Sequence, residues 1–434
     1  MPCIQNNSKE FLIEEIMMLT FRGYIMPAFI VFGIIGSSFV INSFYSMQKL
    51  QPSRFNIYII WITIFQIVDL ITNTLLDDFL GRGLTWASDC SIFIKLDTIS
   101  SFSCKIMNYV PYTAVLTSNT LIVIFSIDRL LTVYKPIKFR GDHCLALPRL
   151  SIIFTICTCM LLFLPQLIYS DLVKNDNTSS LVNGTCQYVN SLYFGVQYSL
   201  YLSTVGGHIT PTILIAIINM MIILRLRYLT KHRQLMYGKR NSIGHTKHPI
   251  DNHTHNNNNN NNNFLNRQYS LSYLLVFNQH KHHPTNEYQT VQNEMRRIIG
   301  HLLVTSIFLL FSIPLVVVII LRQQSDFQNY KKLYPIYAKR LVHLSRLFSS
   351  LTSINCTFDF LIFLLFLPNF RYMVYLSIYS LPLIKTTKYA KKRIEQIEIK
   401  LSSRLRTRFR RSLESKMLQN TFLQRRPVGT STMD

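Results

Sequence analysis

The charged residues that lie inside apolar segments are the first candidates for chemistry in this chain. Asp69 lies within the apolar run 57–80, and a carboxylate in such a setting is costly and usually functional. Asp128 and Arg129 are adjacent near the end of another apolar run, 104–134, where they can form an ion pair. We find no Ser/His/Asp or Cys/His arrangement, phosphate-binding loop or zinc-ligand spacing. The residues indicate charge switching or ion binding, and we expect no enzyme activity.

Long apolar segments must position these residues. Hydrophobic residues make up 49% of the 434 residues and charged residues 15%, where about a quarter charged is usual for a soluble chain. Segments of roughly 20 residues or more are long enough for a helix to cross the bilayer, and backbone groups in lipid must be paired internally. The sequence predicts an all-α membrane protein, a seven-transmembrane helix bundle located in the plasma membrane. The seven runs are 24–47, 57–80, 104–134, 150–169, 200–224, 298–321 and 347–367.

The basic residues predict the orientation. With the amino terminus outside and the carboxyl terminus cytoplasmic, 33 of the 45 Lys and Arg residues lie on inner segments and 11 on outer ones. The net charge of +24 therefore faces anionic membrane lipid, and we expect no nucleic-acid partner. The predicted organisation is an extracellular tail (1–23), a seven-helix receptor domain (24–371) and a basic cytoplasmic tail (372–434). Within the domain, 225–297 is predicted to be a long, largely disordered third inner loop with an Asn-rich run.

Cysteines and glycosylation sequons fall on the predicted outer segments. Cys104 begins the third run and Cys186 precedes the fifth, so a disulfide between them would hold that loop over the mouth of the bundle. Cys3 and Cys90 form either a second disulfide or two free thiols. The predicted glycosylation sites are Asn6, Asn177 and Asn183.

The end of the third run carries a motif of a known family. Asp128-Arg129-Leu130 resembles the Asp-Arg-Tyr motif of rhodopsin-like (class A) G-protein-coupled receptors, with Leu in place of Tyr. Glu294 lies 20 residues before Pro314, where such receptors often carry an acid. The resemblance implies a coupling switch to a heterotrimeric G protein. In this switch Asp128 and Glu294 hold Arg129 at rest, and activation frees its guanidinium.

The seventh run narrows the resemblance. Residues 355–363 are similar to the Asn-Ser-Ser-x-Asn-Phe-x-x-Tyr form of FMRFamide-type neuropeptide receptors, with Asp359 for the second Asn and Phe363 for the Tyr. Asn219, eight residues after Pro211, agrees with that type. The sixth run lacks the family's toggle Trp, and Phe363 lacks the Tyr hydroxyl. We therefore expect activation to differ in detail from that of other members.

The resemblance also implies an allosteric sodium ion. Asp69 looks like the family's buried acid of the second span, although counting from Asn56 places Gln66 at that position. Oxygen ligands suit a hard cation, and the alternative is a water-filled polar network. The implied sodium ligands are Asp69, Ser118, Asn355 and Asp359.

The ligand site is expected among polar and aromatic residues near the outer ends of the helices. Pro111 occupies the position where amine receptors carry Asp, and 347–367 contains no Lys, so neither a monoamine nor retinal is expected. At about 100° per residue, Asp77 is turned about 80° from Asp69 and Asp78 about 180°. Asp77 is therefore favoured to face the bundle; the alternative is an exposed helix-end charge. The predicted ligand-binding residues are Asp77, Asn108, Tyr112, Gln197, Tyr201, His208 and Gln323.

Two kinds of ligand fit these residues. Asp77 would pair with an arginine of a short amidated neuropeptide, whereas Lys339, Arg340 and Arg346 would suit an acidic ligand. The favoured function is a receptor for a short neuropeptide. The alternatives are a divergent chemosensory receptor for a small molecule and, more remotely, a membrane transporter.

Overall fold

The computed structural model describes residues 12–50, 52–92, 94–134, 145–173, 185–188, 198, 201–243, 284–327, 333–379 and 396. These residues form helices and one short two-stranded ribbon. The chain divides into two compact units, 1–367 and 368–434, of which the first holds the helices discussed below. The second contains α15 (Pro368–Tyr379).

Seven helical segments of the described chain are long and apolar enough to cross a membrane. Each overlaps one of the predicted apolar runs, so the predicted seven-helix fold is confirmed. In chain order the first segment consists of α1 (Ile13–Thr20), η2 (Phe21–Ile25) and α2 (Met26–Leu50), and the second of α3 (Arg54–Asp69), η3 (Leu70–Gly83) and α4 (Leu84–Ala87). The third is α5 (Ser101–Tyr134), the fourth is α7 (Ala146–Tyr169), and the fifth consists of η6 (Leu202–Ile209) and α9 (Thr210–Ile243). The sixth is α11 (Pro284–Phe327), and the seventh consists of α13 (Pro335–Thr352) and α14 (Asn355–Phe366).

Local sequence signals set several helix boundaries. The Ser53 hydroxyl accepts a hydrogen bond from the backbone N–H of Asn56 and caps the start of α3. Pro335 opens α13, where its missing N–H costs no intrahelical hydrogen bond. Segments η2, η3 and η6 are π-helical, so the helices that contain them have more residues per turn there than an α-helix has.

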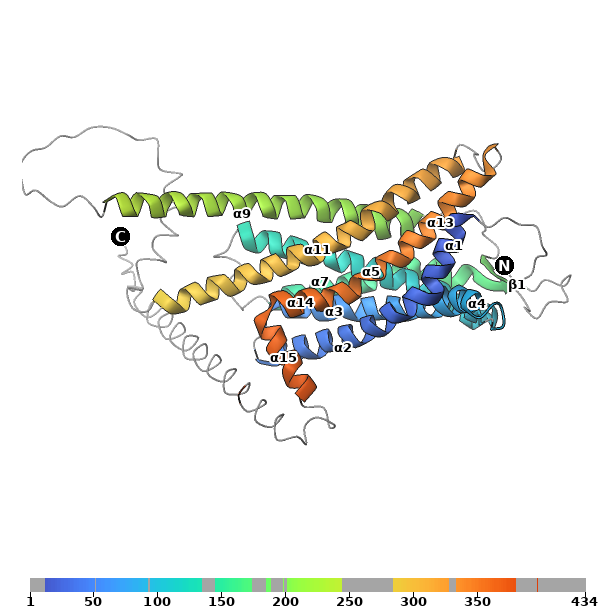
Figure 1. The fold of residues 1–434 in the computed structure, drawn as a ribbon, viewed down its shortest axis with the longest axis horizontal. Coiled ribbons are helices and arrows are strands. Elements are labelled where there is room, and N and C mark those ends of the chain that lie inside the picture. Colours follow the sequence, from blue (N-terminus) through green and yellow to red (C-terminus); the bar gives the residue numbers. More distant parts are fainter. Residues whose placement is uncertain are drawn as a thin grey trace, which may run out of the picture. The chain divides into compact units, whose positions relative to one another are not determined.

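The first helix begins at Ile13, within the segment that the sequence predicts as an extracellular tail. Glu14 and Glu15 interrupt the apolar pattern there, which is why hydropathy places the start later. In the structure both acids pair with α13: Glu15 lies 2.9 Å from Lys339, and Glu14 lies 3.5 Å from Arg340. Figure 1 shows α1 beside α13.

The predicted third inner loop, 225–297, is helical at both of its ends. Helix α9 continues to Ile243, and α11 already begins at Pro284. The Asn-rich run lies outside the described residues. Helix α5 is the most buried of the seven segments and packs against α3, α7 and α9, so it forms the centre of the bundle.

A short ribbon covers one end of α5. Strands β1 (Ser170–Val173) and β2 (Thr185–Tyr188) are antiparallel, with Leu172 opposite Cys186. The 3₁₀ turn η4 (Leu96–Thr98) also packs against this end of α5. We call it the disulfide end, and the end of the bundle near Arg129 the Arg129 end.

The first two helices approach closely at two glycines near the disulfide end. A Cβ atom on Gly83 would lie 2.5 Å from the carbonyl oxygen of Arg22, and one on Gly23 would lie 2.9 Å from that of Gly83. Backbone atoms cannot move aside as a flexible side chain can. Only glycine therefore fits this crossing.

We expect Gly83→Ala to lower the apparent melting temperature of the purified, detergent-solubilised chain by several degrees, because overpacking costs about 1–3 kcal/mol. Gly300→Ala is the matched control, since a Cβ there meets no atom within 4 Å. Alanine also has the higher helix propensity, so the control should be neutral or slightly stabilising. Equal melting temperatures for the two variants would contradict the close crossing.

Candidate functional site

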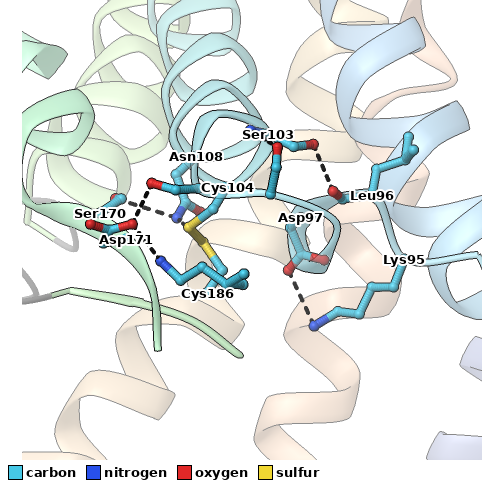
Figure 2. Close-up of a disulfide and its surroundings, with 12 residues drawn as sticks. Lys95, Leu96, Asp97, Ser103, Cys104, Asn108, Ser170, Asp171 and Cys186 are labelled. Carbon is cyan, nitrogen blue, oxygen red and sulfur yellow. Dashed lines mark hydrogen bonds and ion pairs between the residues drawn. A yellow bond between two sulfur atoms is a disulfide. The ribbon is translucent and has the colours of Figure 1, made fainter. Parts of the chain in front are cut away.

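The disulfide end is built around the predicted Cys104–Cys186 bond, which the structure contains. Asn108, one turn further along α5, donates to the Cys186 sulfur at 3.1 Å and to the Ser170 hydroxyl at 3.4 Å. Figure 2 shows this bond and its surroundings. The bond thus joins the ribbon to α5, and Asn108 belongs to that junction as well as to the cavity described below.

Asp171 adds a polar contact between the ribbon and α5. Its carboxylate accepts hydrogen bonds from the Ser101 hydroxyl and from the backbone N–H of Leu172. These two bonds hold the pKa of Asp171 below its ordinary value. The ribbon therefore has a covalent and a polar attachment to the same helix end.

Cys90 is also disulfide-bonded, which rules out the alternative of a free thiol at this position. Its partner lies outside the described residues, as does Cys3. The three predicted glycosylation sites lie outside them as well: Asn6, Asn177 and Asn183.

A cavity of about 330 Å³ extends from the disulfide end toward the middle of the bundle. Four of the predicted ligand-binding residues line it, together with three of the predicted sodium ligands. The former are Asp77, Asn108, Tyr112 and His208, and the latter are Asp69, Ser118 and Asn355. The two sets therefore border one continuous space.

The other predicted ligand-binding residues are placed differently. Tyr201 is 56% exposed and does not line the cavity. It precedes the π-helical η6, whose slower winding breaks the α-helical spacing that would align Tyr201 with His208. Gln323 does not line the cavity either; its side-chain nitrogen is buried without a hydrogen-bond partner in the described structure. Gln197 lies outside the described residues.

Asp77 lines the cavity, and Asp78 faces away from it. Asp77 already has a partner, because the Arg82 guanidinium lies 3.3 Å from its carboxylate. Asp78 is buried and lies 2.9 Å from Arg22 of the first helix. The Ser350 hydroxyl accepts from Arg22 at 2.9 Å and donates to Asp78 at 2.8 Å. This cluster ties the first, second and seventh helices together.

Several charged residues that belong to no sequence motif also line the cavity. Arg82, Lys95 and Asp97 all line the outer part of the cavity, and Lys95 pairs with Asp97 at 3.1 Å. Their signal in the sequence is weak, because a charge beside a predicted span usually faces water. The fold of η4 against α5 is what brings the last two to the cavity.

A polar cluster lies at the deep end of the cavity. The Gln66 side chain donates a hydrogen bond of 3.0 Å to Asp359, which is buried, whereas Gln66 is partly buried. Asp69 lies one turn further along the same helix. Of the two alternatives for the position next to Asp359, the geometry therefore favours Gln66.

Several oxygen atoms of this cluster have no hydrogen-bond partner among the described residues. They are Gln66 Oε1, Asp69 Oδ1 and Asn355 Oδ1. No described basic residue forms an ion pair with Asp69 or Asp359. Buried, unpaired oxygens with excess negative charge are the donor set that a hard cation prefers.

At the Arg129 end, Asp128 binds two arginines. Its Oδ2 atom lies 2.7 Å from Arg129, as the sequence leads us to expect, and its Oδ1 atom lies 3.0 Å from Arg54 at the start of α3. The Arg129 guanidinium lies over the rings of Phe55 and Phe125, at 5.4 and 5.2 Å from their centroids. Arg129 is 5% exposed, so it is enclosed rather than presented to a partner.

The sixth helix closes this end from the other side. His301 is buried, and its ring meets that of Phe125 edge-on at 4.5 Å between centroids. One turn further, Thr305 is joined to Asn219 of α9 by a 2.9 Å hydrogen bond. Glu294 belongs to α11, but its side chain lies outside the described part of the structure. The contacts of Arg54 and His301 were not anticipated, since neither residue carries a motif.

One comparison with known proteins gives a match, and it extends over most of the bundle. Residues 70–363 match the sequence profile of the family described as 7 transmembrane receptor (rhodopsin family). A search of curated proteins finds no match.

Proposed function

Because the chain belongs to the rhodopsin family of seven-transmembrane receptors, we propose that it binds a short peptide at the disulfide end and activates a heterotrimeric G protein at the Arg129 end. The family is one of receptors rather than enzymes or transporters, and its members are multi-pass proteins of the plasma membrane. The observation that carries the proposal is the enclosed Asp128–Arg129 pair at the end of α5 opposite the cavity. Release of this pair would give a bound ligand a means to act across the membrane.

The proposed orientation places the disulfide end outside the cell. Cys104 and Arg129 are 25 residues apart on one helix, which separates them by about 37 Å, enough to mark opposite membrane surfaces. Disulfides persist in the oxidising extracellular space, and the excess of basic residues lies on the segments attached to the Arg129 end.

A short peptide is the ligand class that we propose. The cavity offers both signs of charge (Asp77 and Arg82), amide groups such as Asn108, and the ring of Tyr112. A peptide carries charges, backbone amides and side chains that match such a mixed lining. The resemblance of 355–363 to FMRFamide-type receptors supports a neuropeptide as the physiological ligand.

The test is G-protein activation in cells that express the full chain at a measured surface level. A panel of short peptides, each made as the free acid and as the amide, is applied in a G-protein dissociation assay. Saturable activation by one peptide group supports the proposal. Silence across the panel at confirmed surface expression contradicts a peptide ligand and favours a receptor for another small molecule.

We also propose that the deep polar cluster holds a sodium ion. When bound, the ion would offset one of the two negative charges of Asp69 and Asp359 and would stabilise the resting arrangement of the second, third and seventh helices. Its ligands would come from the unpaired oxygens of Gln66, Asp69 and Asn355, with Ser118 and Asp359 beside them.

Sodium chloride is expected to raise the apparent melting temperature of the purified chain above its value in choline chloride at equal ionic strength. Ligand binding to the folded state alone stabilises it by about 2.7 kcal/mol at a hundred times Kd. Asp359→Asn should remove the difference between the two salts. Asp97→Asn, outside the cluster, should keep it. A melting temperature indifferent to sodium in the unmodified chain would refute the site.

A further inference from the structure

Most acidic side chains at the disulfide end are already neutralised. Each of the following described acids lies within ion-pair distance of a basic residue: Glu14 with Arg340, Glu15 with Lys339, Asp77 with Arg82, Asp78 with Arg22, and Asp97 with Lys95. Some basic residues, in contrast, take part in none of these ion pairs. Arg322 and Arg346 have no described acid within ion-pair distance.

Arg346 lies on the helix that contributes Ser349 and Thr352 to the cavity wall, although Arg346 itself is not part of the lining. Ser349 lines the cavity and follows Arg346 by three residues on α13, and Ser353, which also lines it, is the residue that caps the end of this helix. Residues at this spacing share one face of a helix. Arg346 is an exposed residue of this helix. Its electrostatic neighbours are Arg82, Arg22 and Arg322, with Asp77 the one acid among them.

Arg322 reaches the same region from the sixth helix. It follows the cavity-lining Phe308 by 14 residues, which is about 40° short of four full turns, so both lie on nearly the same face. Its guanidinium donates a 3.4 Å hydrogen bond to Ser345, the residue before Arg346. Arg322 is also an electrostatic neighbour of Tyr112 inside the cavity.

Arg346 therefore has two further guanidinium groups near it, that of Arg322 and that of Arg82, and of the three arginines Arg82 lines the cavity. Asp77 pairs with Arg82, and among the described side chains no acid pairs with the other two arginines. Like charges held close together in a partly desolvated cleft repel one another, and an anion relieves that repulsion. A guanidinium binds a carboxylate through two parallel hydrogen bonds, so it also fixes the orientation of the anion.

We propose that Arg82, Arg322 and Arg346 form a subsite for a carboxylate group of the ligand. The inference rests on the proposed function and deepens it, since it names a chemical feature of the ligand that the receptor would recognise. The proposed ligand is a short peptide with a free carboxyl terminus or a terminal acidic side chain. The rest of the peptide then extends toward Tyr112 and Asn108 in the cavity.

This inference changes the expectation for Asp77. The sequence favoured Asp77 as the partner of an arginine in an amidated peptide. In the structure Arg82 already forms an ion pair with the Asp77 carboxylate, at 3.3 Å. A ligand arginine would have to displace it and would add a further positive charge to a site that already has an excess. The unpaired cations thus favour a free acid over an amide.

The test uses the full chain, purified in lipid nanodiscs, and a readout that does not depend on signalling. The probes are N-acetyl amino acids with aliphatic, aromatic and polar side chains, each paired with its amide. Melting curves are recorded as each probe is titrated. We expect at least one acid to raise the melting temperature in a saturable manner and its amide to bind at least about tenfold more weakly.

Two variants locate the effect. Arg346→Gln and Arg322→Gln should each weaken binding of the active acid by at least about tenfold, in line with the loss of a charge-assisted hydrogen bond. Arg340→Gln is the control on the same helical segment, because Arg340, which the sequence also offered for an acidic ligand, is half exposed and pairs with Glu14. It should leave the affinity unchanged.

The outcomes separate this inference from the proposed function. Equal binding of acids and amides, absence of any stabilisation, or an unchanged affinity in both arginine variants would overturn the carboxylate subsite. Selective stabilisation by an acid would support it even if no peptide activates a G protein, and only the proposed peptide function would then fail.

Discussion

Replacing Arg22 with Met is expected to remove most of the protein from the cell surface. Arg22 and Asp78 are 2% and 4% exposed, and their charged groups lie 2.9 Å apart between the first and second helices. Removing one partner of a buried ion pair leaves the other charge without compensation, at a cost of about 3–5 kcal/mol. The only other described partner of the Asp78 carboxylate is the Ser350 hydroxyl, which is neutral.

A double variant distinguishes this explanation from a simple loss of packing. Arg22→Met with Asp78→Leu removes both charges and should recover much of the surface level and of the melting temperature, because no isolated charge remains. Lys339→Met is the matched control: the Lys339 side chain is half exposed, and ion pairs of exposed lysines contribute about 0–1 kcal/mol. If the double variant were as poorly expressed as the single one, charge compensation would not be the function of this pair.

The apolar runs predict the number of helices because in lipid the backbone has no alternative to internal hydrogen bonding. The helix ends follow a different rule. Glu14 and Glu15 look like tail residues by hydropathy, and only their ion pairs with Lys339 and Arg340 explain why the first helix continues to Ile13. Contacts between segments more than 300 residues apart leave no local pattern in the sequence.

The facing of Asp77 and Asp78 was predicted from α-helical winding, yet η3 is π-helical. The outcome still agrees, with Asp77 at the cavity and Asp78 against Arg22, because Gly23 and Gly83 bring the first helix against one side of η3. Tyr201 shows the opposite result: η6 winds more slowly and its spacing from His208 no longer places both on one face. The position of π-helical turns depends on packing, and a single sequence does not reveal it.

The deep polar cluster shows how a motif can be shared while its charges are exchanged. At the contact between the second and seventh helices, the second contributes the amide of Gln66 and the seventh contributes the carboxylate of Asp359. Counting from Asn56 gives this assignment, whereas the search for a buried acid selects Asp69. Gln66 and Asp69 both line the cavity. With the carboxylates of Asp69 and Asp359, the cluster contains one more acid than the family's motif implies.

Arg129→Ala is expected to abolish G-protein activation without removing the receptor from the surface. The Arg129 guanidinium is enclosed by Phe55, Phe125 and the carboxylate of Asp128 in the structure. Coupling would require its release toward the cytoplasmic side, where its planar group can donate hydrogen bonds to a partner. An alanine cannot do so. We expect the maximal response in the G-protein dissociation assay to fall by at least about tenfold.

Arg54 allows a matched control at the same carboxylate. Asp128 keeps a second partner when Arg129 is lost, because Arg54 lies 3.0 Å from its Oδ1 atom, and this pair limits the damage to folding in Arg129→Ala. Arg54→Gln removes a neighbouring charge while Arg129 remains, and it should retain activation. A full response from Arg129→Ala, or an equal loss in both variants at matched surface levels, would show that Arg129 is not the group that couples this receptor to its G protein.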